Sequence, residues 1–283
     1  MFSDILLLSD FDHTLTAKDS TIPERNIEAI RYFMDNGGTF SANTGRSVPS
    51  ASGVLIPNVP VNAPMVLYNG SAAYDTHKKE FLHASVIDLD AKQVVEDVQA
   101  RFPDLHVEVQ GVEAHYIFHK CEGWEKFNDY NRILWQYKPI EEIPGPFVKF
   151  AIYGQFRDVT VASMYQFTPQ EQARMEEAKE YVEMKYGDKV DVFRSCARLY
   201  DVHAKGCSKL AGGRQLQKAL GKKILVCVGD AENDLAMLEG ADYAFCPSDG
   251  TVADRFENVC PCGEGAVADV IYKKIPEILA KQP

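Results

Sequence analysis

The chain has 283 residues, of which 46% are hydrophobic and 25% are charged, a composition that is typical of a folded globular protein and excludes a disordered or collagen-like chain. Its 41 acidic side chains exceed the 30 basic ones and give a formal charge of −11, so the surface would repel a phosphate backbone and we expect no nucleic-acid partner. Because no apolar run approaches the ~20 residues that cross a bilayer, we expect no membrane partner. The seven cysteines form no CxxC pair and no secretory signal pattern is present, so we expect a cytoplasmic protein.

The N-terminal part of the chain alternates apolar runs with an amphipathic segment. Residues 5–8 are continuously apolar, as in strands that are buried on both faces of a parallel sheet. A helical pattern then begins with Pro23 and Glu24 and is closed by Gly37 and Gly38, and further strands are predicted over residues 39–43 and 65–68. This strand–helix–strand order predicts an α/β fold, a Rossmann-like, doubly wound parallel sheet with right-handed crossovers.

The pattern changes at about Leu82. Strand-like and helical segments now alternate without the βαβ order. Strands are predicted over residues 105–110, 116–119 and 147–153, and helices over residues 91–102, 122–136 and 169–186. Residues 190–196 and 198–203 read as two strands of a hairpin. We therefore predict an inserted domain of the α+β class in this part of the chain.

The first pattern returns after His203. A helix is predicted over residues 209–220 and a buried strand over residues 224–228. This order predicts a Rossmann-like core made of residues 1–82 and 204–283, interrupted by an α+β cap domain of residues 83–203.

Polar residues follow the predicted core strands at their carboxyl ends, where open α/β sheets bind their ligands. Asp10 and Asp12 follow the first strand, Thr44 follows the second, and Asp230 and Asp234 follow a late strand. Asp12 and Asp19 could simply be loop residues, and Asp230 could cap a helix, but four carboxylates at one sheet edge would repel each other strongly. A divalent cation would relieve that repulsion, and all-oxygen ligands point to Mg²⁺.

Four motifs, taken in order, resemble those of the haloacid dehalogenase-like (HAD) superfamily. They are Asp10-Phe11-Asp12-His13-Thr14, Thr44-Gly45-Arg46, Lys209 and Gly229-Asp230-Ala231-Glu232-Asn233-Asp234. The long insert between the second and third motifs, preceded by the Leu67-Tyr68-Asn69-Gly70 turn, is similar to that of the Cof-type, sugar-phosphatase-like branch. The resemblance extends over essentially the whole chain and implies a phosphatase that acts on a small phosphorylated metabolite, most readily a sugar phosphate.

The resemblance also implies catalytic roles for three side chains. Asp10 would be the nucleophile that forms an aspartyl-phosphate. Asp12 would protonate the leaving alkoxide and later activate water. Lys209 would balance the charge of the phosphate and of Asp10.

A second implication of the resemblance is a set of binding residues. The substrate phosphate would be bound by Thr44, Gly45, Arg46 and Asn233. A Mg²⁺ cofactor would be held by the Asp10 carboxylate, the Asp12 backbone carbonyl and Asp230, while Asp234 would act from behind these ligands by orienting them and the metal's waters.

Some alternatives stay open at this point. Lys205 lies four residues before Lys209 and would reach the same edge if the intervening loop is a helical turn. His13 stands where the family usually has glycine, and Asn43 stands where it usually has a small residue. Candidate substrate contacts in the cap include four arginines, Arg132, Arg157, Arg194 and Arg198.

Two other functions compete with a phosphatase. A phosphotransferase of the phosphomannomutase kind shares the motif set and would need a second phosphate on its ligand. A non-catalytic protein that binds a phosphorylated ligand is a third reading, although no carboxylate or lysine of the set is missing. The sequence predicts no particular oligomeric state.

Overall fold

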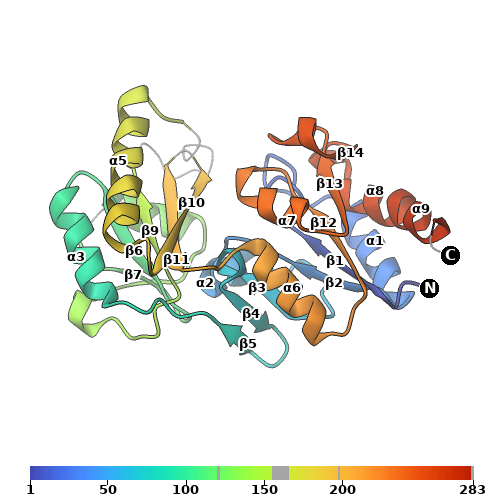
Figure 1. Cartoon of the computed structure of the whole chain (residues 1–283), viewed down its shortest axis with the longest axis horizontal. Coiled ribbons are helices and arrows are strands. Elements are labelled where there is room, and N and C mark those ends of the chain that lie inside the picture. The colour runs from blue at the N-terminus through green and yellow to red at the C-terminus, as the bar shows by residue number, and fades with distance from the viewer. Residues whose placement is uncertain (120–121, 155–165, 197, 282–283) are drawn as a thin grey trace. The chain divides into compact units, whose positions relative to one another are not determined.

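The structure is a computed structural model that describes the chain apart from residues 120–121, 155–165, 197 and 282–283 (Figure 1). By its internal contacts the chain divides into two units. The first unit is Met1–Gly45, Pro57–His83 and Ser208–Pro283, and the second unit is Arg46–Ile56 and Ala84–Cys207. Each unit has its own sheet and its own buried apolar core.

Five parallel strands form the main sheet of the first unit, in the order β14–β13–β12–β1–β2. Every residue of β1 and β12 is buried, as expected for a strand that is covered on both faces. The strand bounds are Ile5–Ser9 (β1), Thr39–Ala42 (β2), Ile224–Val228 (β12), Tyr243–Pro247 (β13) and Glu257–Val259 (β14).

Helices lie on both sides of this sheet, with α6 and α7 on one side and α1, α8 and α9 on the other (Figure 1). On the α6–α7 side, Leu6 and Leu8 of β1 pack with Leu216 and Met237. The helices are α1 (Glu24–Asp35), α6 (Lys209–Ala219), α7 (Leu235–Glu239), α8 (Ala266–Asp269), η7 (Val270–Lys274) and α9 (Ile275–Ala280). A small second sheet joins β3 (Met65–Leu67), β4 (Ala72–Asp75) and β5 (Glu80–Ala84). The predicted Rossmann-like α/β core is confirmed.

The second unit contains a six-stranded sheet in the order β10–β11–β9–β6–β7–β8, which is antiparallel except between β7 and β8. Its strands are β6 (His106–Gln110), β7 (His115–Ile117), β8 (Trp135–Tyr137), β9 (Lys149–Tyr153), β10 (Val190–Cys196) and β11 (Leu199–Ala204). Its helices are α2 (Val48–Val54), α3 (Ala91–Arg101), α4 (Glu122–Tyr130) and α5 (Pro169–Tyr186). The predicted α+β class and the hairpin of β10 and β11 are both present.

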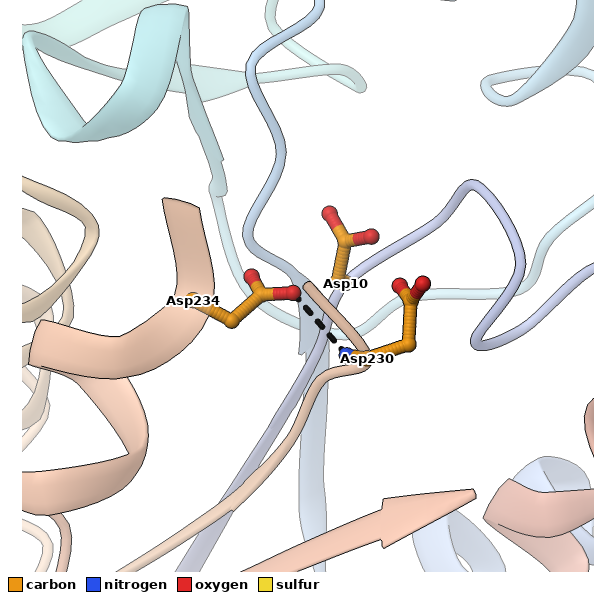
Figure 2. A group of neighbouring side chains, drawn as sticks. All are labelled: Asp10, Asp230 and Asp234. Carbon is orange, nitrogen blue, oxygen red and sulfur yellow. Dashed lines mark hydrogen bonds between the residues drawn. The ribbon is translucent and has the colours of Figure 1, made fainter. Parts of the chain in front are cut away.

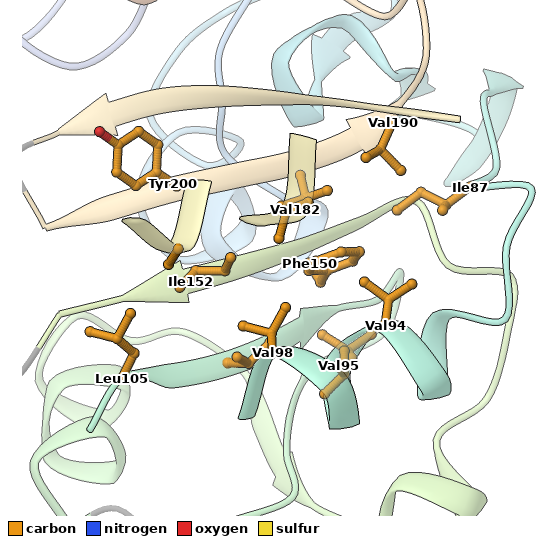
Figure 3. Close-up of a cluster of buried hydrophobic side chains, with 14 of the residues drawn as sticks. Ile87, Val94, Val95, Val98, Leu105, Phe150, Ile152, Val182, Val190 and Tyr200 are labelled. Atoms are coloured by element: carbon orange, nitrogen blue, oxygen red, sulfur yellow. The ribbon is translucent and has the colours of Figure 1, made fainter. Parts of the chain in front are cut away.

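The two faces of this sheet differ, because successive side chains of a strand point to opposite faces. One face is apolar and includes Phe150 and Ile152, which pack with Val98 of α3 and Val182 of α5 (Figure 3). The opposite face is also buried, and it carries an apolar cluster around Trp124 and Tyr153 together with five polar side chains, Glu108, Gln110, Lys149, Asp201 and His203. Buried polar groups need partners, so this face is held together by hydrogen bonds and ion pairs.

The predicted helix over residues 122–136 is too long. Helix α4 ends at Tyr130, Arg132 adopts a left-handed backbone (φ 56°), and the chain reverses into β8, which pairs with β7. The indole N–H of Trp135 donates to Asp129 across this turn (2.8 Å). The conformation of the residues after Tyr130 is therefore set by strand pairing with β7, which overrides their helical periodicity.

The segment Arg46–Ile56 belongs to the second unit by its contacts. The sequence had predicted that it is part of the core, within residues 1–82. Its Ser47 hydroxyl lies 2.5 Å from a ring nitrogen of His115 in β7, which ties the segment to the second sheet. The predicted boundaries at residues 82/83 and 203/204, and the role of the insert as a cap, stay predictions. In the described part of the chain no helix combines the length and the apolar character needed to span a membrane.

Candidate active site

Three carboxylates meet at the carboxyl end of the core strands. Strands β1 and β12 are parallel and in register at Ser9 and Val228, so the residues that follow them emerge at the same edge. The N–H of Asp10 donates to the carbonyl of Val228 (2.8 Å), which fixes Asp10 at this edge. Figure 2 shows the side chains of Asp10, Asp230 and Asp234 around one space, and one oxygen of each lies within 4.8 Å of the other two.

Lys209 is the counter-charge of this cluster. It is the first residue of α6, it is 2% exposed, and its Nζ lies 2.6 Å from Oδ1 of Asp10 and 2.6 Å from Oδ1 of Asp234. Burial by itself would lower the pKa of Lys209, but the two carboxylates outweigh burial and raise this pKa above its ordinary value. The ammonium group therefore stays charged between two fixed acceptors.

Asp234 is held on both of its oxygens. Its Oδ1 accepts from Lys209, and its Oδ2 accepts the backbone N–H groups of Asp230 (3.0 Å) and Ala231 (3.2 Å). Asp230 is oriented by Thr14, whose hydroxyl donates to Oδ1 (2.9 Å). The oxygens of Asp234 thus fix Lys209 and the Asp230 loop, and its role behind the other two carboxylates stays a prediction.

The surroundings of the cluster disfavour the ionised form of two of its carboxyl groups, Asp10 and Asp230. Burial raises the pKa of Asp10 well above its ordinary value, and Lys209 only partly offsets this while Asp234, Asp230 and Asp12 add to it. Burial, followed by the charge of Asp234, raises the pKa of Asp230 to about 7. Asp12, half-buried in the loop after β1, raises the pKa of both groups and is therefore part of the same electrostatic environment.

The donor set fits a divalent cation. Lys209 brings one positive charge to the three carboxylates, which leaves two negative charges in a buried site when all three are ionised. A group with charge +2 and a preference for oxygen ligands balances this excess, and Mg²⁺ has both properties. The fit rests on the charge and chemistry of these residues.

The predicted phosphate-binding residues of the second motif lie in one loop after β2. The N–H of Thr44 donates to Val66 (3.0 Å) and its carbonyl accepts from the N–H of Asn69 (3.1 Å), which holds the loop against β3 and η1 (Tyr68–Gly70). A Cβ at Gly45 would lie 2.7 Å from Oδ1 of Asn69, so a side chain there would require the Asn69 side chain to shift. Arg46 begins the second unit and donates from Nη1 to Oγ of Ser50 (3.1 Å).

Two other candidate residues, Asn233 and Lys205, do not pair with the carboxylates of the cluster in the described part of the chain. Asn233 is half-buried in η4 (Glu232–Asp234), and among the described residues no hydrogen bond joins its side chain to the three carboxylates. Lys205 belongs to the second unit, is 54% exposed and pairs with Asp191 (2.7 Å). The structure thus places Lys209, and not Lys205, beside Asp10.

A sequence profile of the haloacid dehalogenase-like hydrolases matches residues 7–253. The chain belongs to this family. The match confirms the predicted superfamily and the class of a HAD-type hydrolase.

This HAD-like hydrolase has relatives of known name. The HMP-PP phosphatase of Yersinia enterocolitica is 26% identical to it over 242 residues, which cover 81% of this chain and 78% of that protein. A solved HAD-like hydrolase from Bacteroides thetaiotaomicron has a TM-score of 0.78 at 18% identity and covers 95% of this chain and 98% of its own. A solved HAD subclass IIB sugar phosphatase has a TM-score of 0.74 at 18% identity, with coverages of 97% and 98%. These two structures share the fold.

Two residues that position Lys209 in the HAD-like hydrolase were not predicted. Gly70 has a left-handed backbone (φ 93°), and a Cβ there would lie 1.8 Å from the carbonyl oxygen of Ser208, so only glycine lets η1 approach the start of α6. Asn43 donates from Nδ2 to the carbonyl of Lys209 (2.8 Å). The signal for Asn43 was present in the sequence, because a polar residue stands there in place of the small residue that the family usually has.

The remaining sequence candidates are placed as follows. His13 has a left-handed backbone (φ 60°), which explains why glycine is usual at this position. In the second unit, Arg198 is 3% exposed and pairs with Glu171 (2.8 Å), so it stabilises the fold there, whereas Arg132 is exposed. Arg194 lies over the ring of Phe167 (5.7 Å). Arg157 lies outside the described residues.

Proposed function

We propose that this hydrolase is a Mg²⁺-dependent phosphatase that acts on a small phosphorylated metabolite of the sugar-phosphate class through an aspartyl-phosphate on Asp10. The observation that carries the proposal is Lys209, which bridges Asp10 and Asp234 beside Asp230. Phosphoryl transfer requires a nucleophile, a fixed positive charge and an oxygen site for a divalent cation, and this cluster offers all three. The substrate class is proposed from the likeness to the sugar phosphatase and the HMP-PP phosphatase.

In the first half-reaction Lys209 holds Oδ1 of Asp10, and the other carboxylate oxygen attacks the phosphorus. The bond between phosphorus and the leaving oxygen breaks as Asp12 gives its proton to that oxygen. In the second half-reaction Asp12 takes a proton from water, the water oxygen attacks the same phosphorus, and the Asp10 carboxylate is regenerated as inorganic phosphate leaves. Mg²⁺, held by the Asp10 carboxylate, the Asp12 carbonyl and Asp230, would supply positive charge to the phosphoryl oxygens.

Binding of the phosphoryl group falls to a second set of residues. The hydroxyl of Thr44, the backbone of Gly45 and the guanidinium of Arg46 would bind its oxygens, and Asn233 would complete the set. Selection among substrates is assigned to the insert of residues 83–203, whose class of fold differs from that of the core. A cytoplasmic location remains a prediction from the sequence.

Phosphate release from sugar phosphates, nucleotides and cofactor phosphates tests the proposal, measured with Mg²⁺ and with EDTA. We expect release with Mg²⁺, loss with EDTA, recovery when Mg²⁺ is restored, and rates at least about 100-fold lower for Asp230→Asn. Asp35→Asn, the same change at an exposed position of α1, is the control and should match the wild type. Equal rates in EDTA would contradict the metal dependence, and turnover only with a bisphosphate activator would indicate a phosphotransferase.

A further inference from the structure

A line of polar contacts in the second unit leads from its sheet to Arg46. Oε1 of Glu108 in β6 lies 2.7 Å from Nδ1 of His115 in β7, and Nε2 of His115 lies 2.5 Å from Oγ of Ser47. Ser47 is the N-cap residue of α2, and its Oγ accepts the backbone N–H of Ser50 (3.2 Å). The Oγ of Ser50 in turn accepts from Nη1 of Arg46 (3.1 Å).

Glu108, the far end of this line, is a fixed anion. Its side chain is fully buried, and further hydrogen bonds reach its carboxylate from Gln110 (3.2 Å) and Asn128 (3.3 Å). Burial by itself would raise the pKa of Glu108, but the interactions with His115 and Asn128 outweigh it and hold this pKa below its ordinary value. A buried carboxylate that is ionised and held by three side chains is a rigid acceptor.

An ionised Glu108 at 2.7 Å from Nδ1 of His115 favours a proton on that ring nitrogen. The Ser47 hydroxyl can then donate to Nε2 of a neutral ring, or its oxygen can accept from Nε2 of a protonated one. In both cases an oxygen lone pair of Ser47 accepts the N–H of Ser50. The contact between Ser47 and His115 is therefore compatible with the cap of α2 in either state of the ring.

The order Ser47, His115, Glu108 is also the order of hydrogen bonds in serine-hydrolase triads. Two observations argue against a nucleophile here. The Ser47 side chain is 0% exposed, and its oxygen is already used to cap α2. An anchoring role accounts for both.

We propose that Ser47, His115 and Glu108 form a relay that fixes the guanidinium of Arg46, so that two side chains of the second sheet are positioning residues for phosphate binding. The inference rests on the proposed function, in which Arg46 binds the phosphoryl group. Arg46 directly follows Thr44 and Gly45 in the chain, but it belongs by its contacts to the second unit. Its long side chain would lose much conformational freedom on binding phosphate, and the relay removes part of that cost in advance.

Steady-state kinetics on p-nitrophenyl phosphate with Mg²⁺, together with competitive inhibition by inorganic phosphate, test the relay. The first variant, Ser47→Ala, separates α2 from the imidazole. The second, the double variant Glu108→Gln/His115→Phe, breaks the far end without leaving an unpaired buried charge and keeps the Ser47 cap. We expect both to raise KM and the phosphate inhibition constant about 10-fold, a loss of about 1.4 kcal/mol, while kcat changes less than about twofold.

Two controls make the result specific. Thr168→Ala removes the N-cap of α5 in the same unit and should leave KM and the inhibition constant unchanged. In an Arg46→Ala background, Ser47→Ala should have no further effect on KM, because the relay acts only through Arg46. Tryptophan fluorescence reports whether each variant folds, and His115→Gln replaces the double variant if that one does not.

The outcomes separate the relay from the proposed function. Absence of turnover in the wild type would contradict the proposed function itself. With wild-type turnover present, an unchanged KM in the double variant or its replacement would overturn the relay, since the helix cap alone would then position Arg46. Additive effects of Arg46→Ala and Ser47→Ala would overturn it as well.

Discussion

The two units bury polar side chains in opposite ways. In the first unit, three carboxylates meet at the end of parallel strands and only two of them pair with Lys209, while burial is the chief cause that raises the pKa values of Asp10 and Asp230. In the second unit, the buried acids of an antiparallel sheet have their own partners. Burial by itself would raise the pKa of Asp201, but Lys149 at 2.9 Å, with other neighbours, holds it below the ordinary value.

This difference separates a functional cluster from structural pairs. An excess of buried negative charge costs stability and persists where a cation or a reaction uses it. A paired acid whose remaining oxygens accept hydrogen bonds lowers the free energy of the folded state only modestly, but it fixes positions, as Glu108 does for His115. We therefore expect substitutions in the first cluster to affect catalysis and those in the second to affect position and stability.

The largest effect is expected for Asp10→Asn. An amide is no nucleophile and a poor metal ligand, so kcat should fall by about 10⁴-fold or more while circular dichroism and the melting temperature stay close to those of the wild type. Asp19→Asn, in an exposed turn where Asp19 accepts from Thr21, should retain activity. Turnover by Asp10→Asn at more than a few per cent of the wild-type rate would contradict a covalent mechanism.

Lys209→Ala should combine a catalytic and a structural loss. It leaves Asp10 and Asp234 without their shared cation, which we expect to lower the free energy of unfolding by about 3 kcal/mol and to abolish most activity. Lys205→Ala removes one exposed ion pair and should cost less than about 1 kcal/mol with activity retained. Calorimetry and phosphate release measured on both variants compare them directly, and equal losses would contradict the assignment of Lys209.

Acid should weaken the second unit through its neutral histidines. Burial lowers the pKa of His106 to about 4 and that of His203 to about 3, so below pH ~6.5 the unfolded chain takes up protons that the folded chain does not. Stability is therefore lost as pH falls, by about 2 kcal/mol for each histidine between pH 7 and pH 5. Urea unfolding followed by tryptophan fluorescence measures this loss, because both tryptophans, Trp124 and Trp135, belong to the second unit.

His106→Phe isolates one of these two histidines. The ring of His106 lies edge-on to that of Trp124 (5.4 Å), and Nε2 of His106 is buried without a hydrogen-bond partner among the described residues, so phenylalanine should fit at little cost. Relative to the wild type, the variant should gain about 2 kcal/mol at pH 5 and little at pH 7. His77→Gln, at an exposed position of the first unit, is the control. The same loss between pH 7 and pH 5 in His106→Phe as in the wild type would show that His106 does not contribute.

Much of the core was predictable because its signals are local. The apolar run at residues 5–8 and the helix that begins at Glu24 appear close to their predicted bounds. Helix α4 was predicted too long because residues 131–136 have no strong period of their own, and their strand forms only by pairing with β7. The segment Arg46–Ile56 shows the same limit, since its hydrogen-bond partner His115 lies 68 residues away from Ser47.

The sequence by itself determined the family, the order of core elements and the identity of the charged residues at the strand ends, because buried strands, helix boundaries and ordered motifs are written in neighbouring residues. Only the tertiary structure decided which lysine meets Asp10, why Gly70 must lack a side chain, and that Glu108, His115 and Ser47 join. Those contacts connect residues far apart in the chain, and no local pattern encodes a distance between two side chains that only the packed backbone brings together.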